Sequence, residues 1–335
     1  MASQQKGIKF KYKLFPHYIA DYEFAINAPE EFHETVVVEF TPPDNIRPAE
    51  MGVLMDERAD TLDISATIID LAQKGLLVIE EVKKIGIFGK IDYIFKKTEN
   101  KKTLLAYESL LLEKLFKNKS SVKLSELKFS FYKDLSLVKT KLYERIVERK
   151  MFFDNPEVIR KKYLITGILL ACLPIFSLFV LGGFFVSPSM FAVITGIATC
   201  GITLVGFSSR MPKRTADGRE LYRRSLGYKM FISGAEKYRQ QFFENNNLFT
   251  ETLPYAIIFG LSEKFAKAMK DIGIEPKEPK WYRGSSPFAV MSFTKSIDSF
   301  SNTLSSAIAA TPTKSGSSGG GSSGGGFGGG GGGSW

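Results

Sequence analysis

An uncharged stretch, Tyr163–Ser209, contains no Asp, Glu, Lys or Arg, although 24% of the residues in the chain are charged. A helix needs about 20 apolar residues to cross the hydrocarbon core of a bilayer, so the stretch is long enough for two crossings. Gly182 and Pro188 lie near its middle, where a turn is expected. Because lipid offers no hydrogen bonds to the backbone, we predict a two-helix transmembrane hairpin, with spans at about 163–184 and 189–209.

Basic residues flank this predicted hairpin at both ends. They are Arg160, Lys161 and Lys162 before the first span, and Arg210, Lys213 and Arg214 after the second. Lys and Arg beside a span favour the cytoplasmic side of the membrane. We therefore expect a multi-pass protein with both termini in the cytoplasm. The alternative is a buried helical pair in a large soluble core, but neither span has the polar face that would support it.

The composition limits the kinds of site to expect. Both cysteines, Cys172 and Cys200, fall within the predicted spans, and the 2 histidines are His17 and His33. We therefore expect no cofactor, no metal site and no catalytic residues. The net charge of +10 is compatible with nucleic acid binding. However, much of this charge lies beside the hairpin, where anionic lipid attracts each Lys or Arg by about 1 kcal/mol. Membrane lipid is thus an expected partner.

Residues 1–45 are expected to form a β-rich arm. Apolar and basic residues alternate from Ile8 to Leu14, with the period of a half-buried strand. A second run rich in β-branched residues, Val36–Phe40, ends at Pro42. We interpret both runs as strands.

Residues 46–98 are expected to form a winged-helix-like module. Pro48 suits the first turn of a helix, and Asp63 is the expected cap of a second helix that ends before Gly75. Leu76–Val82 and Ile91–Lys96 predict a pair of strands. Two helices followed by a β-hairpin follow the order of a winged helix.

A second winged-helix-like module is expected over 102–156. Helices are predicted over Leu104–Phe116 and Lys133–Lys150, and Ser125 is the expected cap of a short helix between them. Phe152-Phe153 would begin a wing strand before the membrane.

After the hairpin the chain is predicted to be helical. Residues 210–283 should form a small cytoplasmic domain, in which Thr252 caps a helix. An amphipathic helix is expected over 288–310, and a disordered Gly/Ser-rich tail over 311–335. The amphipathic helix either lies in the bilayer interface or docks on the soluble domain. Its apolar stripe consists of Phe293, Ile297, Phe300, Leu304 and Ile308.

Several short motifs follow one another in a fixed order along the chain. They are Pro48–Gly52, Asp63–Ala72 with Gly75, Arg214-Thr215 with Gly218, Gly227–Lys229, Ala235–Arg239 and Leu253–Ile257. In this order they resemble the cytoplasmic half of the DUF 2207 family of uncharacterised bacterial membrane proteins, over about residues 41–335. The resemblance implies a membrane protein and supplies no catalytic residues. Such proteins usually begin with a signal sequence, an extracytoplasmic β-domain and a further span, which we expect this chain to lack.

Together these features predict an α+β membrane protein. It would combine winged-helix-like cytoplasmic modules, a transmembrane hairpin, a small helical domain and a disordered tail. We expect a non-catalytic interaction platform in the bacterial inner membrane, with an unidentified protein partner. The alternative is a membrane-tethered nucleic-acid-binding regulator that uses the basic helix 133–150. The candidate interaction residues are Lys139, Lys141, Arg145, Phe293, Ile297, Phe300, Leu304 and Trp335.

Overall fold

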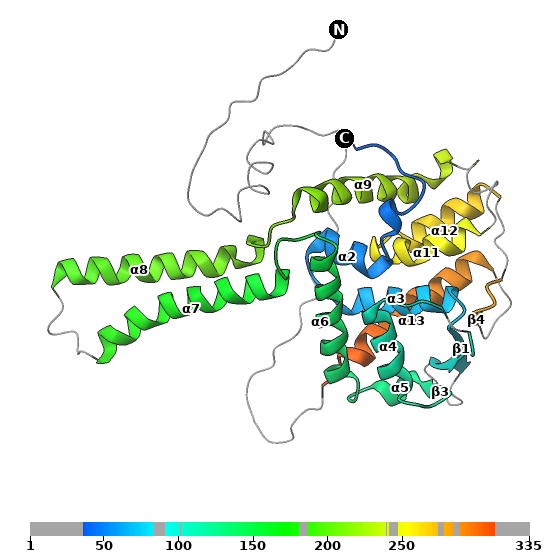
Figure 1. The fold of residues 1–335 in the computed structure, drawn as a ribbon, viewed down its shortest axis with the longest axis horizontal. Helices are drawn as coiled ribbons and strands as arrows, with labels where there is room; N and C mark the ends of the chain where they lie inside the picture. The colour runs from blue at the N-terminus through cyan, green and yellow to red at the C-terminus, as the bar shows by residue number, and fades with distance from the viewer. Residues whose placement is uncertain are drawn as a thin grey trace, which may run out of the picture.

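The computed structural model describes residues 36–83, 91–100, 102–180, 187–238, 240, 247–273, 278–284 and 289–311. The strand expected at Ile8–Leu14 and the tail that ends in Trp335 lie outside the described residues. Within these ranges the protein is mostly helical with a small sheet, which confirms an α+β molecule. A pair of helices projects from a rounded body (Figure 1).

The first part of the body consists of two helices and a β-hairpin. Its elements are η1 (Pro43–Asn45), α2 (Pro48–Asp56), α3 (Thr61–Gln73), β1 (Leu77–Lys83) and β2 (Ile91–Lys97). The antiparallel pairing of β1 with β2 confirms the predicted strand pair. Gly75, which follows α3, has a φ of 76°. This left-handed conformation ends a helix without strain only where there is no Cβ.

Asp60 caps α3, so the prediction that Asp63 does so is wrong. The Asp60 Oδ1 atom accepts hydrogen bonds from the backbone N–H groups of Leu62 and Asp63. Asp63 lies at the third helical position, and its Oδ2 atom accepts the backbone N–H of Asp60 at 2.8 Å. The two carboxylates therefore satisfy the free amides of this helix start reciprocally.

The next elements extend the sheet and lead to the projecting helices. They are α4 (Ala106–Phe116), β3 (Ser121–Lys123), α5 (Leu124–Leu127) and α6 (Tyr132–Glu148). β3 pairs with β2, and β4 (Tyr282–Arg283) runs parallel to β1, which gives the strand order β3-β2-β1-β4. Residues 278–284 thus return to the sheet that the first module began.

Three local predictions in these segments are wrong. Ser125 does not cap α5; its hydroxyl donates to the carboxylate of Asp92 at 2.7 Å. Phe152 forms a single bridge with Arg214 instead of a wing strand. Val36–Phe40 carries no strand. Phe40 packs edge-on against Phe231, with ring centroids 5.3 Å apart.

The chain after the projecting helices returns to the body. Its elements are η3 (Ser208–Arg210), α9 (Ala216–Ser233), η4 (Ala235–Tyr238), α11 (Leu248–Ile258), α12 (Ser262–Asp271) and α13 (Val290–Ala309). Thr252 is not a cap, because α11 begins at Leu248; its hydroxyl instead accepts a hydrogen bond from the Tyr228 hydroxyl at 3.4 Å. The buried apolar residues of the body form one continuous core that includes α2, α3, α6, α11 and α13.

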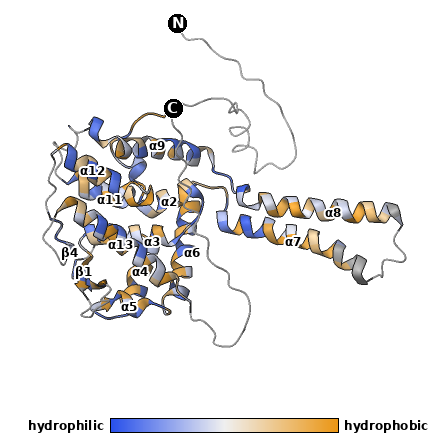
Figure 2. Ribbon diagram, turned by 180° about the vertical axis from the view of Figure 1, so that it is seen from behind, coloured by the Kyte–Doolittle hydropathy of each residue, from blue (hydrophilic) through white to orange (hydrophobic). Residues whose placement is uncertain are grey.

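The projecting pair consists of α7 (Pro156–Val180) and α8 (Pro188–Phe207). α7 begins before the predicted span, so Arg160, Lys161 and Lys162 lie on its first turns. The helices touch where glycines allow close approach: a Cβ on Gly167 would lie 2.8 Å from the carbonyl oxygen of Gly201. Figure 2 shows both helices as largely apolar where they are coloured, and their bases as polar.

Candidate functional site

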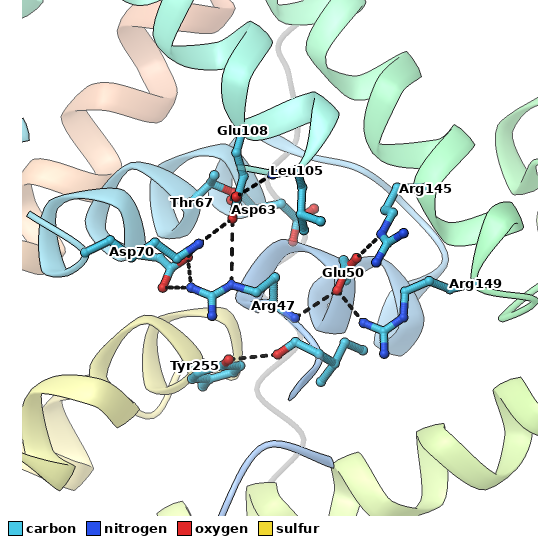
Figure 3. Close-up of polar contacts among 12 residues, drawn as sticks. Arg47, Glu50, Asp63, Thr67, Asp70, Leu105, Glu108, Arg145, Arg149 and Tyr255 are labelled. Carbon is cyan, nitrogen blue, oxygen red and sulfur yellow. Dashed lines mark hydrogen bonds and ion pairs between the residues drawn. The ribbon is translucent and has the colours of Figure 1, made fainter. Parts of the chain in front are cut away.

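A buried carboxylate, Glu50, lies between Arg47, Arg145 and Arg149 (Figure 3). It comes from the first turn of α2 and is 0% exposed. Its Oε1 atom accepts from Arg145 Nε at 3.0 Å and its Oε2 atom from Arg149 Nη1 at 2.7 Å. The backbone N–H of Arg47 also donates to Oε2, at 2.9 Å. Glu50 therefore ties α2 to the last turns of α6.

A second charged cluster lies on the other side of Arg47. Arg47 contacts the carboxylate of Asp70 on α3 with Nη2, and its Nε atom lies 3.7 Å from Glu108 Oε1 on α4. Lys74 lies 2.7 Å from the same Glu108 oxygen and 3.3 Å from Asp70 Oδ2. Glu108 is almost fully buried. Two cations and two anions thus neutralise one another where three helices meet.

Tyr107 is a further buried group beside these charges. Its hydroxyl has no hydrogen-bond partner among the described residues. Burial, together with the nearby carboxylates of Glu50 and Glu108, raises the pKa of Tyr107 well above its ordinary value. The side chain is therefore neutral and contributes no charge to the cluster.

Arg214, after α8, clamps the carboxyl end of α2. Its Nε and Nη2 atoms donate to the carbonyl oxygen of Leu54 at 3.0 and 2.9 Å, and Nη1 lies 3.1 Å from Glu57 Oε1. Its guanidinium also lies over the ring of Tyr222, 4.3 Å from the centroid. A guanidinium suits this site because it presents several donors in one plane and stacks on aromatic rings. Arg214 therefore fastens the end of the hairpin to the body.

Two further residues of the sequence motifs, Gly218 and Tyr255, form contacts between elements that are far apart in the sequence. Gly218 on α9 lies against Met151, and a Cβ at Gly218 would be 1.9 Å from the Met151 carbonyl oxygen. The hydroxyl of Tyr255 on α11 donates to the carbonyl oxygen of Ile46 at 2.8 Å, and the ring is buried. The sequence motif around Tyr255 is therefore part of a packed helix.

Asp63 is packed directly against α2. A Cβ on Gly52 would lie 1.9 Å from Asp63 Oδ1, so only glycine leaves room for this carboxyl group. Burial, with a smaller contribution from the negative charge of Asp60, raises the pKa of Asp63 well above its ordinary value. This carboxyl is therefore more easily protonated in the folded protein than in the unfolded chain.

A cavity of about 330 Å³ opens beside the Arg47 cluster. Arg47, Asp70 and Lys74 line its floor, and aromatic rings such as those of Tyr228 and Tyr255 line its wall. The described residues contain no cluster of three or more His, Cys, Asp or Glu side chains that would hold a metal ion. The charged side chains that line its floor are of both signs and are paired with one another, which suits a polar, uncharged molecule.

The residues that form these contacts lie within the part of the sequence that matches a known protein family. The family model described as "Predicted membrane protein (DUF2207) C-terminal domain" matches residues 37–269. The chain belongs to the DUF2207 family. No curated protein and no solved structure matches it.

In this DUF2207 protein the matched range includes α7 and α8 and parts of the body on either side of them. The residues that carried the resemblance, among them Glu50, Arg214, Gly218 and Tyr255, form the contacts between elements far apart in the sequence. They are thus residues that hold the fold together. The motifs themselves give no sign of which distant elements these residues contact.

The basic residues predicted to flank the membrane occupy three kinds of position. Arg160 donates to the carbonyl oxygen of Glu57 at 2.8 Å, and Arg214 clamps α2 as described. Lys161 pairs with Glu157 one turn earlier on α7. Arg210 lies over the ring of Phe207, and Lys162 and Lys213 are exposed. Two of the six therefore attach the hairpin to the body.

The candidate interaction residues are divided between surface and core. Lys139 is half-buried, Lys141 is exposed and pairs with Glu144, and Arg145 is held by Glu50. The apolar stripe of α13 docks on the body, which resolves the choice left open by the sequence. Its buried residues are Phe293, Ile297, Phe300, Leu304 and Ile308.

The buried acidic residues Glu50 and Glu108 were not predicted as site residues from the sequence. Glu50 and Glu108 each lie in the first turn of a helix and each accept the N–H of the residue three positions before, Arg47 and Leu105. A Glu three residues into a predicted helix is half of a capping box, and that signal was available. Their burial and their Arg and Lys partners depend on tertiary packing.

Proposed function

We propose that this DUF2207 protein is a non-catalytic interaction platform anchored in the bacterial inner membrane. The observation that carries the proposal is the exposed apolar surface of the projecting pair. Phe176 on α7 and Ile202 on α8 are 64% and 63% exposed. An unpartnered apolar surface of this extent needs lipid or another apolar partner. A bilayer satisfies it along the whole projection.

The topology that we propose has both spans ending at the same membrane face. α8 is the described helix that is long and apolar enough to cross a membrane, over Ser189–Arg210. α7 packs along it at Gly167 and Gly201, as small residues do at helix contacts in membranes. The basic residues at the base favour the cytoplasmic side. The body and both termini would then be cytoplasmic.

Support for a platform comes from the continuity of the body. The helices and strands before α7 would form two winged-helix-like modules, the second without its wing strand, and such modules often bind other proteins. They share one apolar core with the helices after α8. Because Arg160 and Arg214 also fasten the hairpin to α2, the body would be held in a fixed orientation at the membrane.

The test begins with the chain in its native membrane. Alkaline carbonate extraction should leave it in the membrane pellet, and release into the supernatant would contradict the anchoring. A photo-crosslinking amino acid is then placed at Leu137 or Phe129, which are exposed on the body, and at Val193 on α8 as the control. We expect a discrete protein adduct from the body positions and not from Val193. Identical patterns at all three positions would contradict the platform.

The alternative, a membrane-tethered nucleic-acid-binding regulator, receives less support. Glu50 holds Arg145 and Arg149, so two of the basic residues of α6 are engaged within the protein. Lys139 and Lys141 remain for phosphate contacts. Duplex DNA binding that falls steeply with salt, and that is lost on reversal of these two lysines to glutamate, would favour the regulator. We expect no such binding.

A further inference from the structure

A cleft of about 450 Å³ lies where the projecting pair joins the body. The body contributes Arg58 from the α2–α3 loop and Lys139 and Tyr143 from α6. The projecting pair contributes Leu164 on α7, and η3, which follows α8, contributes Ser208 and Ser209. Figure 1 shows α6 beside the base of α7. If α7 and α8 cross a bilayer, the cleft lies at the level of the cytoplasmic headgroups.

The cleft has an excess of positive charge. Four cations line it, Arg58, Lys139, Arg160 and Lys161, against two carboxylates, Asp60 and Glu157. Both carboxylates are already engaged: Asp60 caps α3, and Glu157 pairs with Lys161. By contrast, Arg58 and Lys139 have no carboxylate within 4.0 Å among the described residues. Two cations are therefore available to an anion in the cleft.

A buried hydroxyl adds a donor to these cations. The oxygen of Tyr143, which is 2% exposed, accepts the backbone N–H of Ala59 at 2.8 Å and faces Arg160 Nη2 at 3.5 Å. Both neighbours are donors, so the proton of the hydroxyl has no acceptor among the described residues. Tyr143 lines the cleft. An oxygen atom of a bound anion would supply the missing acceptor, because buried hydroxyls normally donate as well as accept.

The cleft continues into the apolar surface of α7. Leu164 forms its edge on this side, and Ile165 and Ile168 beyond it are exposed along the helix. A charged cleft that opens onto an apolar groove fits an amphiphile with an anionic head. A soluble anion would use the cations and the hydroxyl but would leave this apolar edge uncovered.

We propose that this cleft binds the phosphodiester headgroup of an anionic phospholipid, with an acyl chain along α7. Arg58 and Lys139 would contact the phosphate oxygens, and Tyr143 would donate to one of them. Arg160 would complete the cationic wall while it keeps its bond to Glu57. The inference rests on the proposed membrane anchoring, and it adds a defined lipid and defined ligands to it.

Native mass spectrometry of the full chain in detergent tests the inference, with phosphatidylglycerol, phosphatidylcholine and inorganic phosphate as probes. We expect one phosphatidylglycerol to bind at least about tenfold tighter than phosphatidylcholine. Each cation near an anionic lipid contributes about a fivefold factor, so Arg58→Gln with Lys139→Gln should weaken phosphatidylglycerol binding about twenty-five-fold. Lys133→Gln with Lys141→Gln is the matched control: it removes the same charge from α6 outside the cleft and should leave binding unchanged.

The charge-conserving pair Arg58→Lys with Lys139→Arg guards against loss of folding and should retain most of the binding. Equal affinity for both lipids, or full binding by the glutamine variant, would overturn the inference. Inorganic phosphate that binds as tightly as phosphatidylglycerol would assign the cleft to a soluble anion and also overturn it. A chain that carbonate releases from membranes would instead refute the anchoring, so the two failures can be distinguished.

Discussion

Replacement of Glu50 by glutamine tests the central joint of the body. The side chain keeps its size, but its charge is lost and its amide group points donors at Arg145 or Arg149, which are also donors. Both arginines then lose their carboxylate while they remain partly buried. The same change at Glu144 removes the partner of Lys141 from an exposed pair and serves as the matched control.

The expected magnitude follows from burial. Breaking a buried ion pair by removal of one partner costs about 3–5 kcal/mol. Glu50 is 0% exposed, but the side chains of Arg145 and Arg149 are 33% and 19% exposed, which places the loss near the lower limit. We therefore expect a loss of about 3 kcal/mol in the free energy of unfolding. The exposed Glu144 pair should contribute less than about 0.5 kcal/mol.

Thermal unfolding of the full chain in detergent measures this difference. For a body of this size, each kcal/mol corresponds to about 2–4 °C in Tm, so Glu50→Gln should lower Tm by about 6–12 °C. Glu144→Gln should change Tm by no more than about 2 °C. Equal shifts for the two variants would refute the reasoning that Glu50 fastens α2 to α6.

Three further substitutions test other joints, each by the Tm of the full chain in detergent. Gly218→Ala should lower the free energy of unfolding by about 1–3 kcal/mol, because the added Cβ would overlap a backbone carbonyl. Gly196→Ala is the control and should leave it unchanged, because no atom lies within 4 Å of the added Cβ. Similar losses for the two variants would contradict the close contact at Gly218. Arg214→Lys should lower the free energy of unfolding by about 2 kcal/mol, because lysine lacks the planar guanidinium that donates twice to the Leu54 carbonyl. Lys213→Gln, at the exposed neighbouring residue, should lower it by less than about 0.5 kcal/mol. Because burial raises the pKa of Asp63, its contribution to stability is fully present below the unfolded pKa of about 4 and is lost as pH rises through the folded pKa. Asp63→Asn should therefore flatten the decline of Tm above about pH 4, and an unchanged slope would contradict this assignment.

Local sequence signals predicted most of the secondary structure. The strand run Ile91–Lys96, the glycine at Gly75 and the helical spacing after Lys133 each correspond to an observed element, because these patterns reflect the backbone itself. Caps were predicted less well. Asp60 and Asp63 are both good cap residues three positions apart, and the choice depends on where the chain turns away from α2.

Tertiary contacts decided what local patterns left open. The stripe on α13 has the same spacing whether it contacts lipid or protein, and only its packing against Tyr93 and Phe95 of the sheet shows that it is docked. In the same way, the sequence of α6 shows that it carries basic residues. It does not show that Arg145 is paired with Glu50, which lies 95 positions earlier in the chain. Contacts between residues this far apart have no local signature.

The central claim is that α7 and α8 form a hairpin across the membrane with the body on the cytoplasmic side. Single cysteines test it in a Cys172→Ala, Cys200→Ala background, with Ser189→Cys at the start of α8 and Ser136→Cys on α6 of the body. A membrane-impermeant maleimide added to intact spheroplasts should label Ser189→Cys, and should label Ser136→Cys only after the membrane is permeabilised. Labelling of both positions, or of neither, in intact spheroplasts would contradict the account.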